Sequence, residues 1–181
     1  MTPAKYSVQE RLRDGRPIEI RALRSNDETD MLAAIDRTGA ESLQRRFFVT
    51  KRGFSEKEKA FFMNVDFVDH VALVAVIDED GRPAIVGGGR YVVTRPGEAE
   101  VAFVVVDAFQ GQHIGALLTK HLTGLARAAG LKELVADVLP ENMAMRKILG
   151  KFGFRTARSL DPQVVHLTLP LVSTDLAPPK Q

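Results

Sequence analysis

The 181-residue sequence contains no cysteine. This absence excludes disulfide bonds, zinc sites built from thiolates and any mechanism that passes through a cysteine acyl-enzyme. The sequence also lacks an uninterrupted apolar run near the roughly 20 residues that span a bilayer, and its first residues lack the apolar core of a signal peptide. We therefore expect a cytoplasmic protein with no membrane partner.

Neither sign of charge dominates, and aromatic side chains are few. The formal net charge is only +2, although the pI is about 9.0, and aromatic residues make up 7% of the chain. Both values disfavour a nucleic acid as the partner. The hydrophobic content of 45% is that of an ordinary globular protein. At this length we expect one domain, residues 1–172, followed by a disordered tail at 173–181.

Acidic residues are absent from 108–132, which contains the start of a predicted helix. We expect a Val-rich strand at 99–106, a polar loop at 107–113 and then a helix that opens at 114–116. The first turn of a helix has four N–H groups without internal partners at the positive end of its dipole. With no carboxylate nearby, a phosphate or pyrophosphate is the expected ligand. Apolar residues at helical spacing support the helix, and Gly130 is its expected cap: Ile114, Leu117, Leu118, Leu122, Leu125 and Ala129.

Two other phosphate-binding motifs are excluded by the letters of the sequence. No G-x-x-x-x-G-K-[ST] occurs, so the loop is not a P-loop. The run Gly87-Gly88-Gly89 begins a G-x-G-x-x-G motif that fails at Val92, and a strand follows it where the motif requires a helix.

Two blocks of sequence resemble motifs of the GNAT N-acetyltransferases. Residues 107–118 (DAFQGQHIGALL) resemble the acyl-CoA loop of that family, Q/R-x-x-G-x-G/A after a Val-rich strand. Residues 140–154, from Asn142 and Ala144 to Gly153-Phe154, resemble its later motif. The blocks occur in the family's order and together span about 99–154. The resemblance implies an N-acetyltransferase that uses acetyl-CoA as its cosubstrate and needs no metal.

The order of predicted elements looks like the GNAT fold. Its class is α/β, with a mixed, mostly antiparallel sheet, a central parallel strand–helix–strand unit and helices on both faces. The crossover rule makes the strands at 99–106 and 133–139 parallel, and the strands at 70–77, 84–94 and 99–106 form an antiparallel meander. We further expect strands at 18–23 and 164–171, a helix capped at 25–27 that ends at Gly39, helices at 41–48, 55–64 and 142–151, and a loose arm at 1–8.

The resemblance also assigns the contacts to acyl-CoA. Val104, Val105 and Val106 would contact pantetheine through backbone groups, and Asn142 would bond the pantetheine arm. Arg146, one helical turn after Asn142, is either a phosphate partner or a solvated arginine. The pyrophosphate contacts fall on Gln110, Gly111, Gln112, His113, Ile114, Gly115 and Ala116.

His113 departs from the family pattern, because it stands where the first glycine of the loop motif is expected. Glycine at that position allows a positive φ, and histidine is among the few other residues that tolerate it. The imidazole either adds a donor to the phosphate site or belongs to an ordinary surface loop.

Glu100 is the candidate general base. A carboxylate on so apolar a strand is costly to bury, and burial would raise its pKa into the range that suits a base. A similar A-E-x-A glutamate has this role in the protein-lysine acetyltransferase branch; the alternative is a solvated or arginine-paired Glu100 at the mouth of the strand. Asp137 either holds a water or the incoming amine, or forms a structural ion pair. We assign no role to His166.

Without cysteine, direct attack of the amine on the thioester in a ternary complex is the simplest mechanism. Family members often carry a tyrosine general acid where this sequence has Leu149, and both tyrosines, Tyr6 and Tyr91, lie outside the motif. The general acid is therefore unassigned. A thiol pKa of about 8.5 still makes the thiolate a fair leaving group.

The acceptor is indicated only by resemblance. Residues 12–21, 41–48 and 99–103 resemble bacterial acetyltransferases that modify lysines of acyl-CoA synthetases. The alternatives are a small-molecule amine as acceptor, or a non-catalytic acyl-CoA sensor. A homodimer is common in the family.

Overall fold

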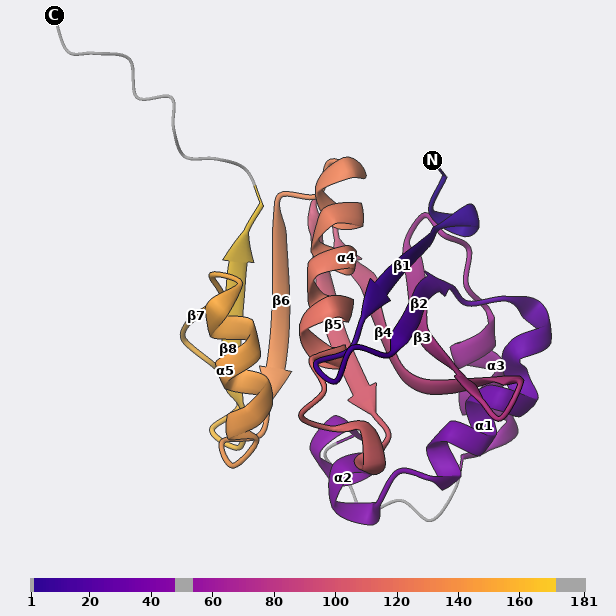
Figure 1. The fold of residues 1–181 in the computed structure, drawn as a ribbon. Coiled ribbons are helices and arrows are strands. Elements are labelled where there is room, and N and C mark those ends of the chain that lie inside the picture. Colours follow the sequence, from indigo (N-terminus) through magenta and orange to yellow (C-terminus); the bar gives the residue numbers. More distant parts are fainter. Residues whose placement is uncertain (1, 48–53, 172–181) are drawn as a thin grey trace, which may run out of the picture.

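The computed structural model describes residues 2–47 and 54–171, which form an eight-stranded sheet with helices on both faces (Figure 1). The strands are β1 (Ser7–Arg11), β2 (Pro17–Ala22), β3 (His70–Glu79), β4 (Arg82–Arg95), β5 (Glu98–Val105), β6 (Glu133–Val138), β7 (Arg155–Thr156) and β8 (Val165–Pro170). They lie in the order β1-β2-β3-β4-β5-β6-β8-β7, and in the described residues only β5 and β6 pair in parallel. The prediction of a mixed, mostly antiparallel sheet with one parallel unit is confirmed.

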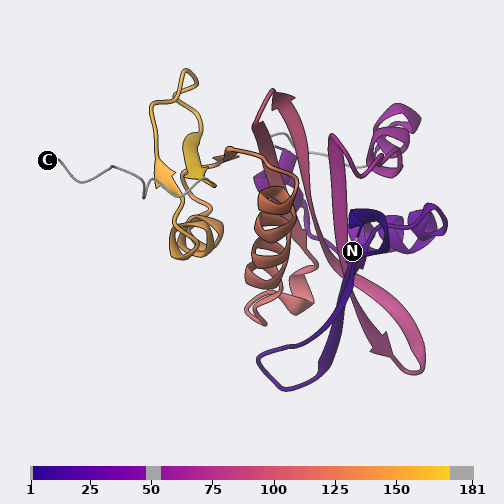
Figure 2. The same cartoon turned by 90° about the horizontal axis from the view of Figure 1, so that it is seen from above.

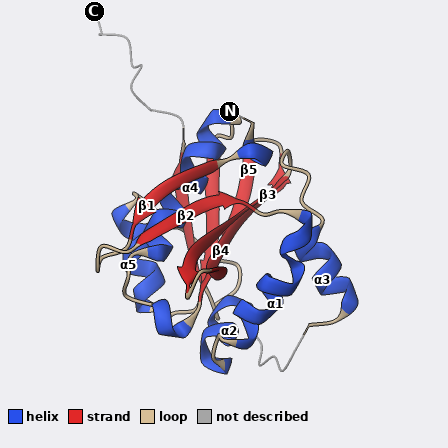
Figure 3. Cartoon of the chain, turned by 45° about the vertical axis from the view of Figure 1, so that its right-hand side comes forward, coloured by secondary structure: helices blue, strands red, loops and turns tan. Residues whose placement is uncertain are grey.

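The helices lie on opposite faces of this sheet. Figures 2 and 3 show α1 and α3 on the side of the sheet away from α4, and α5 beside α4. Ala102 and Val104 of β5 line a small apolar pocket together with Met31 and Ala34 of α1, so this side of β5 faces α1. The helices are α1 (Glu28–Asp36), α2 (Ala40–Phe47), α3 (Glu56–Met63), α4 (Ile114–Ala128) and α5 (Met143–Lys151). None of the helices in the described ranges is both long and apolar enough to cross a membrane.

Two glycines of β4 allow α4 to approach the sheet closely. A Cβ atom on Gly89 would lie 2.7 Å from Cδ1 of Phe103 and 2.9 Å from Cδ1 of Leu122, and one on Gly87 would lie 2.9 Å from Cγ2 of Ile114. In the run Gly87-Gly88-Gly89, which does not complete a dinucleotide-binding motif, the first and third glycines therefore make room for side chains of α4 and β5. The continuous apolar run of β3 is explained by its central position, since the strand is buried from His70 to Ile77.

The predicted loose arm at 1–8 is wrong. Residues Pro3–Lys5 form a 3-10 helix, and β1 pairs with β2 from Ser7 to Arg11. Tyr6 is anchored to α4, because its hydroxyl lies 2.6 Å from Nδ1 of His121. Nε2 of the same ring donates to Glu10 at 2.9 Å, so Nδ1 accepts the tyrosine proton. The alternation of apolar residues in the edge strand β1 is weak. The contact between Tyr6 and His121 that anchors this segment is long-range, so no local pattern indicates it.

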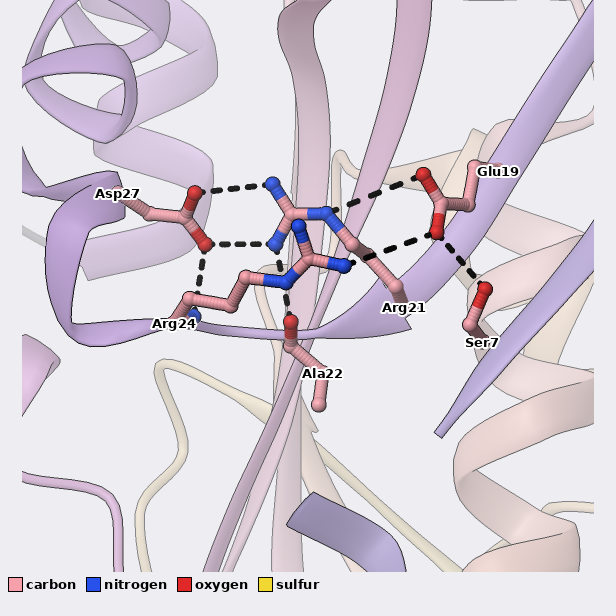
Figure 4. A network of polar contacts seen from close by, with 6 residues as sticks. All are labelled: Ser7, Glu19, Arg21, Ala22, Arg24 and Asp27. Atoms are coloured by element: carbon pink, nitrogen blue, oxygen red, sulfur yellow. Dashed lines mark hydrogen bonds and ion pairs between the residues drawn. The ribbon is translucent and has the colours of Figure 1, made fainter. Parts of the chain in front are cut away.

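Figure 4 shows a buried ion pair at the end of β2 that the sequence did not indicate. Nη1 and Nη2 of Arg21 donate to the Asp27 carboxylate at 2.6 and 2.8 Å, and the backbone N–H of Arg24 donates to it at 2.7 Å. Burial raises the pKa of Asp27, but these hydrogen bonds outweigh it and hold the pKa below its usual value. The side chain of Asp27 was expected to cap a helix and instead binds Arg21. The helix predicted at 55–64 is present as α3, and Ser55 and Glu58 form a capping box at its start.

Two predictions fall partly on residues outside the described ranges. The helix expected at 41–48 corresponds to α2, and Phe48 lies beyond its described end. The expected tail at 173–181 also lies outside the described residues.

Candidate active site

The neighbouring strands β5 and β6 are paired over only three positions. Their register joins Glu98 to Glu133, Ala99 to Leu134 and Glu100 to Val135, although β5 continues to Val105 and β6 to Val138. A cavity of about 580 Å³ is lined by both strands, the start of α4 and α5. Its volume is in the range of small-molecule and cofactor sites.

Most of the predicted site residues line this one cavity. Val106 is buried away from it, and the guanidinium of Arg146 donates to the carbonyl oxygen of Pro140 at 3.0 Å. Gln112 also lies outside the lining, and its Oε1 is buried with no hydrogen-bond partner in the described part of the chain. The residues that the cavity brings together are Glu100, Val104, Val105, Gln110, Gly111, His113, Ile114, Gly115, Ala116 and Asn142.

The N-terminus of α4 opens onto the cavity. His113 has φ of +73°, and Gly111 has φ of +78°. The histidine therefore adopts the left-handed conformation for which the family pattern has glycine, and its imidazole lies in the cavity lining. No acidic residue occurs in the first turn of α4. The N-terminal end of α4 is thus an accessible site with a positive potential that favours an anion.

Side-chain contacts hold the loop before α4. Nε2 of Gln110 lies 3.1 Å from Oγ of Ser42 and 3.3 Å from the carbonyl oxygen of Val105. The first contact joins the loop to α2, and the second joins it to the end of β5. Gln110 therefore fixes the loop relative to both walls of the cavity.

Asn142 caps α5 at the opposite wall of the cavity. Its Oδ1 accepts from the backbone N–H of Met145 at 3.2 Å. The capping bond uses the oxygen, so the amide Nδ2 is the group of this side chain that can donate to a ligand.

Glu100 lies at the point where β5 and β6 part. Its side chain is exposed in the cavity wall, so the prediction that the apolar strand buries it is wrong. The physical reason is its place in the sheet: Val135 is its last partner on β6, and no further pair of the two strands covers it. The position of Glu100 in the cavity, and not burial, therefore makes it the candidate base.

Asp137 is paired with His166, so it has a structural partner, which was one of the two roles expected for it. Oδ1 of Asp137 lies 2.6 Å from Nδ1 of His166, across the antiparallel pair of β6 and β8. Asp137 also lines the cavity. No local pattern links the two residues, because they are 29 positions apart.

Sequence reasoning missed four polar residues in the lining. Lys147 and Lys151 come from α5, and their spacing of four is the signal that places both on one side of that helix. Arg13 comes from the turn between β1 and β2, and Ser42 from α2. These three cations add positive charge to the lining of the cavity.

The structure does not supply a tyrosine for the missing general acid. Leu149 is fully buried at the motif position and lines the cavity. The hydroxyl of Tyr6 is bonded to His121, and Tyr91 is buried in the core. Neither tyrosine lines the cavity.

Comparison with known proteins agrees with this geometry. The model of the acetyltransferase (GNAT) family matches residues 38–154. An acetyltransferase of Pseudomonas aeruginosa is 32% identical over 160 residues, which are 87% of this chain and 86% of that protein. The solved GNAT domain of S. lividans PAT has a TM-score of 0.84 and 31% identity, and the match covers 91% of this chain and 96% of that one.

A longer relative matches only over part of its length. The acetyltransferase Pat of Mycolicibacterium smegmatis is 36% identical over 118 residues. These are 63% of this chain and 34% of that protein, so this chain corresponds to one part of it.

Proposed function

This chain belongs to the GNAT acetyltransferase family, and from that premise we propose that it transfers the acetyl group of acetyl-CoA to the side-chain amine of a protein lysine by direct attack in a ternary complex. One observation carries the proposal. A single cavity contains the open edge of β5, the positive start of α4 and the carboxylate of Glu100. These are the groups that a thioester, its phosphates and an incoming amine require.

The residues of the cavity fit acetyl-CoA as a substrate. The backbone N–H groups at the start of α4 bind the pyrophosphate, with Lys147, Lys151 and Arg13 as the nearby cations. Beyond Glu100 the edge of β5 has no pair on the β6 side, so backbone groups near Val104 are available to a pantetheine chain.

The chemistry then requires three steps from this chain. Glu100 removes a proton from the ammonium group, and the freed amine attacks the thioester carbonyl carbon. Backbone N–H groups of β5 stabilise the tetrahedral oxyanion. The attack forms the C–N bond, and the tetrahedral intermediate then collapses as the C–S bond breaks and its electron pair leaves on the thiolate of CoA. The thiolate takes up the second proton of the nitrogen, and a thiol pKa of about 8.5 makes it a fair leaving group.

The lysine acceptor rests on sequence similarity. Residues 12–21 and 99–103 resemble bacterial enzymes that modify lysines of acyl-CoA synthetases, and two of the similar proteins carry the name Pat. A small-molecule amine is the main alternative, and the test below separates the two.

The test uses acetyl-labelled CoA, the purified chain and a bacterial lysate that is afterwards divided into protein and small-molecule fractions. We expect label in one or a few protein bands, and we expect the Glu100→Gln variant to lose it. Label confined to the small-molecule fraction would replace the lysine acceptor with a metabolite. Absence of label from both fractions, with acetyl-CoA binding intact, would contradict catalysis and leave an acyl-CoA sensor.

A further inference from the structure

The Asp137–His166 pair lies on the same face of the sheet as Glu100. Glu100 and Val135 are register partners in the parallel ladder, so their side chains share a face. Asp137 is two residues beyond Val135 and returns to that face, and His166 lies opposite Asp137. Ala102 and Val104 also point to this side, where they meet α1. The pair and the candidate base therefore project together, away from α4.

The pair orients one carboxylate toward the cavity. A carboxylate only accepts, so Nδ1 of His166 donates to Oδ1 of Asp137 in the 2.6 Å contact. The Asp137 side chain is 38% exposed and lines the cavity, whereas His166 is 27% exposed and lies outside the lining. Since Oδ1 is engaged by the imidazole, Oδ2 is the oxygen that a cation in the cavity can reach.

The acceptor amine arrives as a cation, because the pKa of a lysine side chain is about 10.4. The base that deprotonates it must therefore first hold an ammonium group. Lys147 and Lys151 also line the cavity, but they come from α5, which packs on α4: a Cβ on Gly115 of α4 would lie 3.1 Å from Ile148 of α5. Figure 2 shows α4 and α5 on one side of the sheet. Lys147 and Lys151 thus come from the α4 side of the sheet, whereas Glu100 and Asp137 come from the other side.

We infer that Asp137, held by His166, binds the ammonium group of the acceptor beside Glu100. Glu100 takes the proton, and His166 is a positioning residue that fixes the Asp137 carboxylate. The acceptor side of the cavity is accordingly selective for a cationic amine over a neutral nucleophile of the same size. This inference rests on the proposed function, because it places the acceptor next to a thioester bound in the same cavity.

The experiment compares two stable CoA thioethers by calorimetry. S-(3-aminopropyl)-CoA carries an ammonium group near the position of the incoming amine, and S-propyl-CoA is its neutral counterpart. The ratio of the two dissociation constants measures the contribution of the ammonium group, and the change of this ratio in a variant measures the part that depends on the substituted residue. We expect the aminopropyl compound to bind about two- to fivefold more tightly to the wild-type chain, as for a partly exposed ion pair. We expect Asp137→Asn to remove most of that preference and His166→Phe to reduce it.

Controls separate this inference from the proposed function. Asp80→Asn makes the same charge change in the β3–β4 turn, outside the cavity lining, at a φ of +55° that asparagine tolerates, and it should leave the ratio unchanged. Unaltered binding of S-propyl-CoA to Asp137→Asn shows that the variant is folded and that the CoA site is intact. Equal binding of the two compounds to the wild type, or an unchanged ratio in Asp137→Asn, would overturn the inference. Failure of both compounds to bind the wild type would instead overturn the proposed function.

Discussion

Glu100 and Val135 are the last residues that pair β5 with β6. Beyond them the two strands separate, and the cavity occupies the space between their ends and the start of α4. The carboxylate of Glu100, at the point where the strands separate, therefore lies beside the backbone edge of β5 that a pantetheine chain would use. The local break in the sheet thus places the proposed binding edge and the proposed base in one site.

The side chain of His113 gives the first prediction. His113 is held at a positive φ of 73°, where glycine avoids the steric cost that other residues carry. We expect His113→Gly to raise the melting temperature and, by removing an imidazole from the cavity lining, to weaken binding of CoA a few-fold. Calorimetry with CoA and with pantetheine measures this directly.

Comparing CoA with pantetheine shows whether His113 acts on the phosphates of CoA. Pantetheine lacks the phosphates, so its affinity should be the same for wild type and His113→Gly. An equal loss for both compounds would mean that His113 does not act on the phosphates. Unchanged affinity for both would leave His113 as a surface loop residue.

Close packing of α4 on the sheet gives the second prediction. A Cβ on Gly89 would lie 2.7 Å from Phe103 and 2.9 Å from Leu122, so Gly89→Ala overpacks the core and should cost about 1–3 kcal/mol of unfolding free energy. Gly124 is the matched control, because its Cβ would meet nothing within 4 Å. There, alanine should stabilise the helix by up to about 1 kcal/mol. Urea unfolding of both variants is the measurement, and destabilisation of equal size at both sites would refute the packing argument.

The buried ion pair of Arg21 and Asp27 gives the third prediction. Asp27→Asn leaves the guanidinium buried opposite a neutral amide, and the expected loss is about 3–5 kcal/mol. Asp14→Asn removes an exposed partner of Arg16 and should change stability little. Chemical denaturation distinguishes the two, and a similar small effect at both positions would show that the Arg21 pair is not important for stability.

His121 gives a prediction about pH. Burial lowers its pKa, although Glu10 acts in the opposite direction. The unfolded chain, in which the imidazole pKa is about 6.5, therefore binds the proton more readily than the folded chain. This contribution to stability is fully present above pH 6.5 and is lost as the pH falls from there toward the lower folded pKa. Burial lowers the pKa of His70 in the same direction.

The test follows the free energy of unfolding between pH 5 and 8. His121→Gln should flatten part of the slope below pH 6.5, with the remainder due to His70. Because the variant also loses the contact to Tyr6, the slope and not the absolute stability is the readout. A slope identical to that of the wild type would show that His121 does not contribute.

Particular residues show what the sequence could and could not predict. The loop 107–113 and the helix after it were predictable because helical spacing, glycines and missing carboxylates are local signals. The exposure of Glu100 was not, since it depends on where β6 separates from β5. The pairing of Arg21 with Asp27 and the anchoring of Tyr6 by His121 depend on side chains from separate elements meeting in space. Lys147 and Lys151 had a helical spacing that placed them together, but no local signal directed them to the cavity.

Glu100→Gln tests the central claim most directly. The substitution removes the proton acceptor and keeps the shape of the side chain, so we expect turnover with acetyl-CoA and the labelled acceptor to fall about a hundredfold or more. The dissociation constant for acetyl-CoA should stay within about twofold of the wild type, because Glu100 does not hold the cosubstrate. Glu133→Gln, at the other end of the same short ladder, should leave both values unchanged. Full turnover by Glu100→Gln, with acetyl-CoA binding intact, would contradict the account and remove Glu100 from the mechanism.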